Sequence, residues 1–171
     1  LAGFEEKYGM EYTTAYKDET PDSGLMERHK HDIFPLMKKR YLFSGVEDFF
    51  FYDGWSNGSV NENVFAYSTR YGDERAIVFY NNVYNQANGW IQTSCKYAVK
   101  DAEGNIHQET KNLCDALGLS SEPNTYLIFR EHRTEKWYIR RISEIREKGM
   151  FLSLNGFEYQ VYLDIQEVVD T

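Results

Sequence analysis

The sequence is poor in cysteine and proline. Its 171 residues include only two cysteines, Cys95 and Cys114, and only three prolines. Two cysteines are too few for a disulfide framework, so we expect two buried free thiols in a reducing compartment, and therefore a cytoplasmic protein. The scarcity of proline, together with an aromatic content of 16%, argues against a disordered chain.

The chain also lacks the features that mark membrane proteins and nucleic-acid-binding proteins. It has no apolar run of the roughly 18 residues that a membrane-spanning helix needs, and no signal-peptide pattern at its start. Acidic residues outnumber basic ones, 27 to 19, whereas polyanion-binding domains normally carry a basic excess. We therefore expect neither a membrane nor a nucleic acid as a partner.

The aromatic residues that are present point to β-structure. There are 14 Tyr, 11 Phe and 3 Trp, and aromatic side chains suit the half-buried surface of a sheet. After Gly45 the apolar residues recur with a period of two, and turn signals separate about eight short strands. This spacing predicts a mainly β domain, an antiparallel sandwich, over residues 46–171.

Residues 1–45 have a different pattern. Residues 1–22 show no clean period and predict a loop. From Asp22 or Ser23, a helix N-cap, apolar residues recur every three or four positions as far as the basic cluster before Ser44-Gly45. Pro35 either kinks this helix or begins a second one. The apolar positions of the predicted helix are Leu25, Met26, His29, Ile33, Leu36 and Met37.

Besides a hairpin across residues 101–105, with residues 106–110 as its return strand, three hairpins are predicted within the β domain, and the last has the strongest turn signal. Segments 63–70 and 75–82 form the first, and the second of these strands is apolar on both faces, which predicts that both are covered. Segments 124–131 and 137–141 form the next, and 150–154 pairs with 157–164 across Asn155-Gly156. In that final strand the predicted dry face consists of Phe157, Tyr159, Val161 and Leu163, and the predicted wet face of Glu158, Gln160, Tyr162 and Asp164.

No residue pattern predicts catalysis, a metal or a cofactor. His29 and His31 are two positions apart in a segment with helical spacing, where such side chains point in different directions, so we expect no metal site there. The acidic residues form no specific pair, and neither a phosphate-binding glycine loop nor a nucleophile elbow is present. We therefore assign no catalytic residue and expect no cofactor.

Three aromatic residues are the candidates for sugar binding. Trp55 lies among turn-forming residues (DGWSNGS), where an exposed indole could stack on the apolar face of a sugar ring. Tyr71 and Tyr84 lie in loops rich in tyrosine. The alternative for Trp55 is a partly buried anchor that closes one end of the sandwich. We expect Trp90 and Trp137 to pack in the core or at a sheet edge.

The order of several segments resembles the α-amylase family, glycoside hydrolase family thirteen. VFAYSTRYGDERAIVFYNN and FLSLNGFEYQVYLDI resemble the first and last strands of its C-terminal β-domain. ERHKHDIFPLMKKRYLFSG resembles the last helix of its (β/α)8 barrel, and GFEEKYGMEYTTAY is similar to the loop after the eighth barrel strand in a subgroup of large bacterial members.

This resemblance implies a fragment of a larger enzyme. Residues 1–45 would be the end of the barrel, and residues 46–171 a Greek-key sandwich that stabilises the upstream barrel of the same polypeptide. The catalytic acids of the family follow the fourth, fifth and seventh barrel strands, so they would lie before Leu1, in agreement with the absence of an initial Met. The chain would then be an accessory domain of a glycosidase or glucanotransferase that acts on α-glucans, not catalytic by itself.

Two other functions remain open. The chain could be a starch- or glycogen-binding module that uses Trp55, Tyr71 and Tyr84, or an unrelated β-sandwich that mediates protein contacts. In addition, the apolar face of the helix would be exposed without a barrel, which predicts a sticky patch and self-association through this segment.

Overall fold

The computed structural model describes residues 20–170, and the chain divides into two compact units, residues 1–40 and 41–171. The division falls a few residues before the boundary at 45 and 46 predicted from the sequence. Residues 1–19 of the predicted loop 1–22, including the barrel-like segment 3–16, lie outside the described residues.

The first unit contains the predicted helix. Asp22 is its N-cap, and its carboxylate accepts a hydrogen bond from the backbone N–H of Leu25 at 3.0 Å. Pro35 lies in the first turn of a new helical segment, which confirms the prediction that it begins a second helix. The successive segments are α1 (Ser23–Arg28), the π-helical turn η1 (His29–Ile33), α2 (Phe34–Lys38) and α3 (Arg40–Phe43), the last of which crosses into the second unit.

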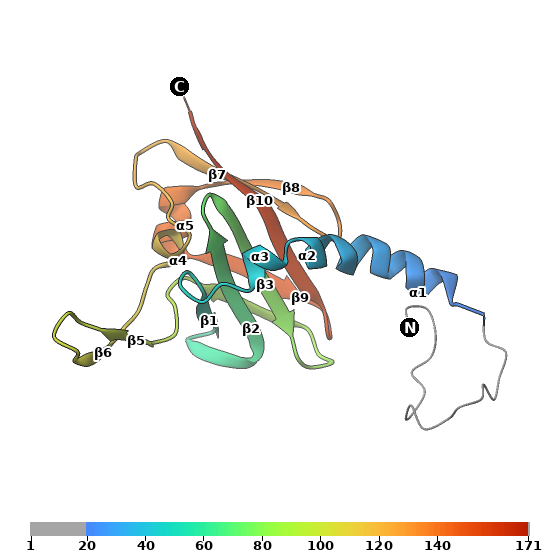
Figure 1. Cartoon of the computed structure of the whole chain (residues 1–171), viewed down its shortest axis with the longest axis horizontal. Coiled ribbons are helices and arrows are strands. Elements are labelled where there is room, and N and C mark those ends of the chain that lie inside the picture. The colour runs from blue at the N-terminus through green and yellow to red at the C-terminus, as the bar shows by residue number, and fades with distance from the viewer. Residues whose placement is uncertain (1–19, 171) are drawn as a thin grey trace. The chain divides into compact units, whose positions relative to one another are not determined.

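The second unit confirms the predicted fold class, a mainly β, antiparallel, sandwich-like domain. Its main sheet has eight strands in the order β8-β7-β10-β3-β2-β1-β4-β9 and is curled (Figure 1). The run β4-β1-β2-β3 has the strand order of a Greek key. The strands of this sheet are β1 (Phe50–Ser56), β2 (Ser59–Tyr71), β3 (Glu74–Asn81), β4 (Ala87–Ile91), β7 (Thr125–Glu131), β8 (Trp137–Arg141), β9 (Met150–Leu154) and β10 (Tyr159–Val169).

A hairpin and two short helices complete this unit. The hairpin consists of β5 (Tyr97–Lys100) and β6 (Ile106–Glu109), and the helices are α4 (Leu113–Ala116) and α5 (Ile142–Lys148). Both helices bury apolar side chains in the core, and their burial removes apolar surface from water, which stabilises the fold. Fully buried core members include Ile77, Phe79, Ile91, Leu113, Leu117, Leu127, Ile142, Leu152 and Leu154.

The two cysteines are free, and their burial differs. Cys114 is buried in the core, and this burial raises the pKa of its thiol to about 11. Cys95, which was also expected to be buried, is only partly so. Its backbone N–H donates to the carbonyl of Phe51 on β1 at 2.7 Å.

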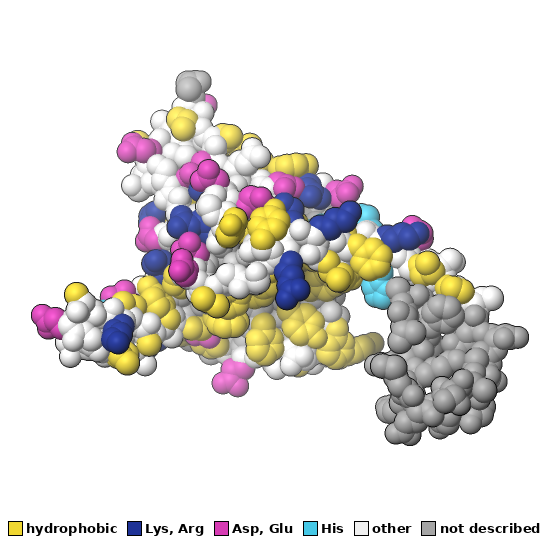
Figure 2. Space-filling model, viewed as in Figure 1, with side chains coloured by type: hydrophobic (Ala, Val, Ile, Leu, Met, Phe, Trp, Pro, Cys, Tyr) yellow, Lys and Arg dark blue, Asp and Glu magenta, His cyan; other side chains and the backbone are white. Residues whose placement is uncertain are grey.

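Several aromatic side chains remain exposed on the sheet, and hydrophobic side chains gather over one part of it in Figure 2. Ile77 and Phe79 of β3 are buried, but Tyr80 is 37% exposed and stacks with Phe65, which is 49% exposed. The second face of β3 is therefore only partly covered, contrary to the prediction from its sequence.

The predicted hairpin between residues 150–154 and 157–164 is wrong. β9 pairs with β4 at one edge of the sheet, whereas β10 lies between β3 and β7. The connection between β9 and β10 is bound to the loop after β3. The buried amide of Asn81 donates to the carbonyl oxygens of Asn155 at 2.8 Å and Asn85 at 2.7 Å. Asn155-Gly156 therefore turns the chain from the sheet edge toward its interior instead of joining two neighbouring strands.

The faces predicted for this last strand are correct only in part. Val161 and Leu163 are buried as expected, but Phe157 is 54% exposed. Tyr162, predicted to face water, is buried because its ring packs against Phe79 and Phe129 at centroid distances of 5.3 and 4.8 Å. The strand is thus covered on both faces at this point, and alternation does not continue past a register shift that follows Leu163.

Candidate functional site

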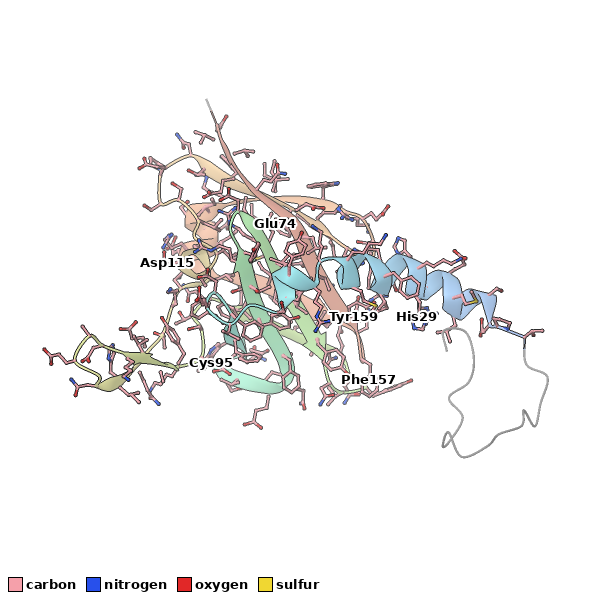
Figure 3. All side chains as sticks on the ribbon, in the orientation of Figure 1. His29, Glu74, Cys95, Asp115, Phe157 and Tyr159 are labelled. Carbon is pink, nitrogen blue, oxygen red and sulfur yellow. The ribbon has the colours of Figure 1, made fainter. Side chains whose placement is uncertain are left out.

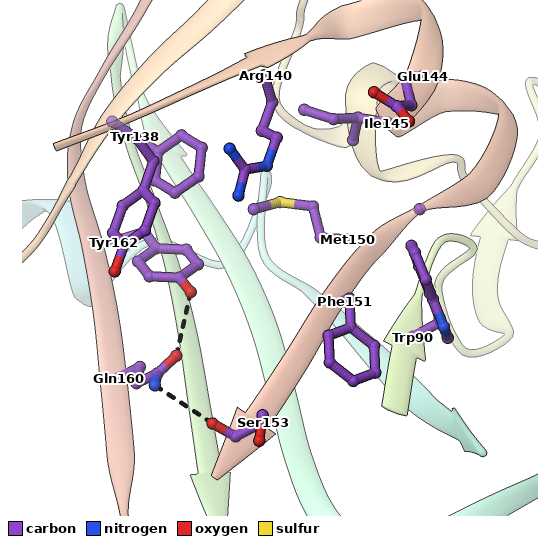
Figure 4. Close-up of a pocket in the computed structure, with 12 residues that line it drawn as sticks. Trp90, Tyr138, Arg140, Glu144, Ile145, Met150, Phe151, Ser153, Gln160 and Tyr162 are labelled. Carbon is purple, nitrogen blue, oxygen red and sulfur yellow. Dashed lines mark hydrogen bonds between the residues drawn. The ribbon is translucent and has the colours of Figure 1, made fainter. Parts of the chain in front are cut away.

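A pocket of about 350 Å3 opens where β9 and β10 fail to pair (Figure 4). Residues from five strands and one helix line it, which is possible because the sheet curls until its β9 edge faces β8 and β10. The lining consists of Trp90, Phe129, Tyr138, Arg140, Glu144, Ile145, Gly149, Met150, Phe151, Ser153, Gln160 and Tyr162.

Gln160 spans the gap between the two strands. Its side-chain amide donates to the backbone carbonyl of Ser153 on β9 at 3.4 Å, and its carbonyl oxygen accepts from the hydroxyl of Tyr162 at 3.0 Å. Burial raises the pKa of Tyr162 far above its ordinary value, so this hydroxyl stays protonated and keeps donating. The first bond links β10 to β9 across the gap, and the second, within β10, orients the amide of Gln160.

Aromatic rings form two walls of the pocket. On one wall Phe129 and Tyr138 stack with centroids 5.4 Å apart. Across the pocket in Figure 4 stand Trp90 and Phe151, whose centroids are 5.3 Å apart. Rings of this kind present flat apolar faces to a ligand, and concave apolar sites with a few polar groups are typical of small-molecule binding.

Polar groups lie at the rim. The guanidinium of Arg140 donates to the carbonyl of Ile139 at 2.8 Å and lies 5.8 Å from the Tyr138 ring centroid. Within residues 20–170 no carboxylate forms an ion pair with it, whereas Glu144 pairs with Lys148 at 3.3 Å. Arg140 therefore keeps N–H donors that a ligand hydroxyl can use.

The three aromatic residues predicted for sugar binding do not form one site. Trp55 is 49% exposed and lies on β1, directly opposite Trp90 of the pocket. Tyr84 is 84% exposed and contacts Phe157 edge to face, at a centroid distance of 6.3 Å. Tyr71 is 61% exposed and lies opposite Glu74 at the end of the β2–β3 hairpin.

Tyr71 is far from the other two. Val60, the partner of Trp55, and Tyr71 both lie on β2, eleven residues apart, a span of about 36 Å in extended strand. Figure 3 shows Glu74, which lies opposite Tyr71, and Phe157, which contacts Tyr84, at different ends of the sheet. Of the three candidates, only Trp55 adjoins the pocket.

Sequence reasoning missed most of the pocket. Trp90, expected to pack in the core or at an edge, is 44% exposed and forms part of a pocket wall. Tyr138, Arg140 and Gln160 carried no local signal, because they meet only through pairings between distant segments. The one usable signal was the alternation of β4, which places Trp90 on the face opposite the buried Ile91.

The pocket lining offers few groups for acid–base or metal chemistry. Glu144 is the only acidic residue in its lining, whereas glycoside hydrolysis requires two carboxyl groups across the scissile bond. Over residues 20–170 no group of three or more His, Cys, Asp and Glu residues could hold a metal ion. His31 bonds to the adjacent Asp32 at 2.7 Å.

In the described part of the chain, no helix has the length and apolar character needed to cross a membrane. No protein-family model matches the sequence, and no curated protein matches it significantly.

Proposed function

We propose that this chain is a carbohydrate-binding β-domain and that the pocket between β9 and β10 holds a sugar residue. The observation that carries the proposal is the arrangement of aromatic rings on two walls, with Arg140, Glu144, Ser153 and Gln160 beside them. A pyranose ring has apolar C–H faces that stack on such rings and hydroxyl groups that hydrogen-bond at its edge. The choice of α-glucans as ligand rests on the resemblance of the segments to the α-amylase family.

Calorimetric titration with maltoheptaose tests this proposal. We expect measurable binding by the wild-type chain and a large loss of affinity in Trp90→Ala and Tyr138→Ala, each of which removes one wall. Tyr71→Ala is the matched control, because Tyr71 is an exposed aromatic residue at the far end of β2. Absence of heat with the wild-type chain would contradict the proposal, and cellohexaose in a parallel titration tests the choice of α-linked glucan.

A second candidate function is the stabilisation of an upstream barrel in an α-amylase-family protein. Exposed apolar side chains on the helical unit favour it, with Ile33, Phe34 and Met37 between 37% and 65% exposed. In this role the chain would reside in the cytoplasm and have no activity alone. Turnover of starch by the purified 171 residues would contradict it.

A further inference from the structure

Three exposed aromatic residues form one row across neighbouring strands. Trp55 on β1 is directly opposite Trp90 on β4, and Trp90 is directly opposite Phe151 on β9. Residues directly opposite each other in a sheet point to the same face. All three are about half exposed, at 49%, 44% and 52%.

The row is continuous with the pocket. Trp90 and Phe151 belong to the pocket wall, and Trp55 lies one strand farther out. The backbone beneath the two tryptophans is closely packed, since a Cβ on Gly89 would lie 3.2 Å from the carbonyl oxygen of Trp55. The rings therefore stand on strands whose separation is fixed, which favours a preformed surface.

We propose that the sugar site extends from the pocket over this row and selects a linear oligosaccharide over a mono- or disaccharide. The inference rests on the proposed function of the pocket. Neighbouring strands are about 4.8 Å apart, close to the length that one hexose adds to a glucan chain, so successive rings match successive sugars. One sugar inside the pocket, one over Trp90 at its wall and one over Trp55 correspond to a chain of about three residues or longer.

The row contains only apolar side chains, with Val60 as its next member on β2. A surface of this kind stacks on a neutral sugar chain and offers no charge to a polyanion. The occupant is therefore a neutral glucan chain, laid across β9, β4 and β1 with one end in the pocket.

Titration with maltose, maltotriose, maltopentaose and maltoheptaose tests the proposal. We expect the affinity of the wild-type chain to rise with ligand length and then level off. Trp55→Ala should weaken maltoheptaose binding about tenfold and leave maltose binding unchanged, because only the longer ligand reaches this ring. Trp90→Ala should weaken the binding of both ligands.

Two further variants separate a binding role of Trp55 from a structural one. Trp55→Tyr retains a ring and should recover most of the affinity for maltoheptaose, and Trp55→Thr provides a ring-free variant with high strand propensity. Equal affinity for short and long ligands, or unchanged maltoheptaose binding in Trp55→Thr, would overturn the extended site and leave the pocket intact. If no sugar of any length binds, the proposed function fails as well.

Discussion

Single buried polar side chains hold the loops beside the pocket. Asn81 is fully buried, and its amide group ties the loop after β3 to the loop after β9 through the carbonyl oxygens of Asn85 and Asn155. Glu131 is also buried, and its carboxylate accepts from the backbone of Arg133 and Thr134 at the β7–β8 turn. In each case a side chain forms hydrogen bonds with backbone groups that strand pairing leaves without a partner.

We expect Asn81→Ala to lower the free energy of unfolding by about 1–3 kcal/mol, because it removes the two hydrogen bonds that this fully buried amide donates to the carbonyl oxygens of Asn85 and Asn155. The neighbouring Asn82 is exposed, and Asn82→Ala should have little effect. Urea denaturation of the two variants beside the wild type measures the difference. Equal stability of all three proteins would show that the two loops do not depend on Asn81.

The carboxyl group of Glu131 predicts how the stability of the fold depends on pH. Burial acts to raise the pKa of its carboxyl, but hydrogen bonds from Thr134, Arg133 and Val161 outweigh burial and hold this pKa below its ordinary value. A lowered pKa in the folded state means that stability is present above the unfolded pKa of about 4.3 and is lost as the pH falls through the folded value.

Urea midpoints measured from pH 7 to pH 3 check this. The wild type should lose stability more steeply below about pH 4.3 than Glu131→Gln, whose side chain does not titrate. Glu122→Gln, at an exposed position before β7, should follow the wild type. Parallel curves for the wild type and Glu131→Gln would contradict the assignment.

At the scale of elements, pairings between adjacent segments could be predicted and distant ones could not. The hairpins β2–β3, β5–β6 and β7–β8 are confirmed, because turn residues and alternation encode them locally. The helix start at Asp22 was predictable for the same reason. The partners of β9 and β10 depend on the curl of the whole sheet, so a strong turn signal at Asn155-Gly156 led to the wrong pairing.

In the candidate site too, residues with a local sequence signal could be predicted and residues brought together from distant segments could not. Trp55 could be found because its turn-forming neighbours marked it as exposed, although it lies on β1 and not in the turn itself. The opposite wall of the pocket, with Tyr138 and Arg140, comes from β8, nearly fifty residues from Trp90 in sequence. No local pattern records that these segments face each other.

The β9–β10 connection yields a prediction of its own. A Cβ on Gly156 would collide with the backbone of Tyr84, so Gly156→Ala should destabilise the domain by about 1–3 kcal/mol and disturb the pocket. Gly45→Ala is the matched control, because nothing lies within 4 Å of the added atom there. Thermal unfolding of both variants makes the comparison, and equal melting temperatures would contradict the close approach.

At the scale of the whole molecule, exposed apolar side chains occur on both units. Met37 is 65% exposed on the helical unit, and Phe51 and Phe65 are 54% and 49% exposed on the sheet. Apolar surface of this extent favours association with a partner or with a second copy. The helical segment is the surface for which self-association was predicted from the sequence.

Sedimentation over a range of protein concentrations measures this association. The apparent mass of the wild type should rise with concentration, and Ile33→Ser/Met37→Ser should remain monomeric. Phe65→Ser, placed on the sheet, should associate like the wild type if the helix provides the contact. Loss of association only in Phe65→Ser would assign the contact to the sheet, and a monomeric wild type at every concentration would contradict self-association.

The position of β10 has a consequence for biosynthesis. β10 is the last strand of this sheet in chain order, yet it lies inside the sheet between β3 and β7. Until it arrives, the nascent β1–β2–β3 meander has an open edge at β3, and such edges recruit strands from other chains. The sheet therefore closes only after β10 has been synthesised, and until then the open edge of β3 exposes the chain to aggregation.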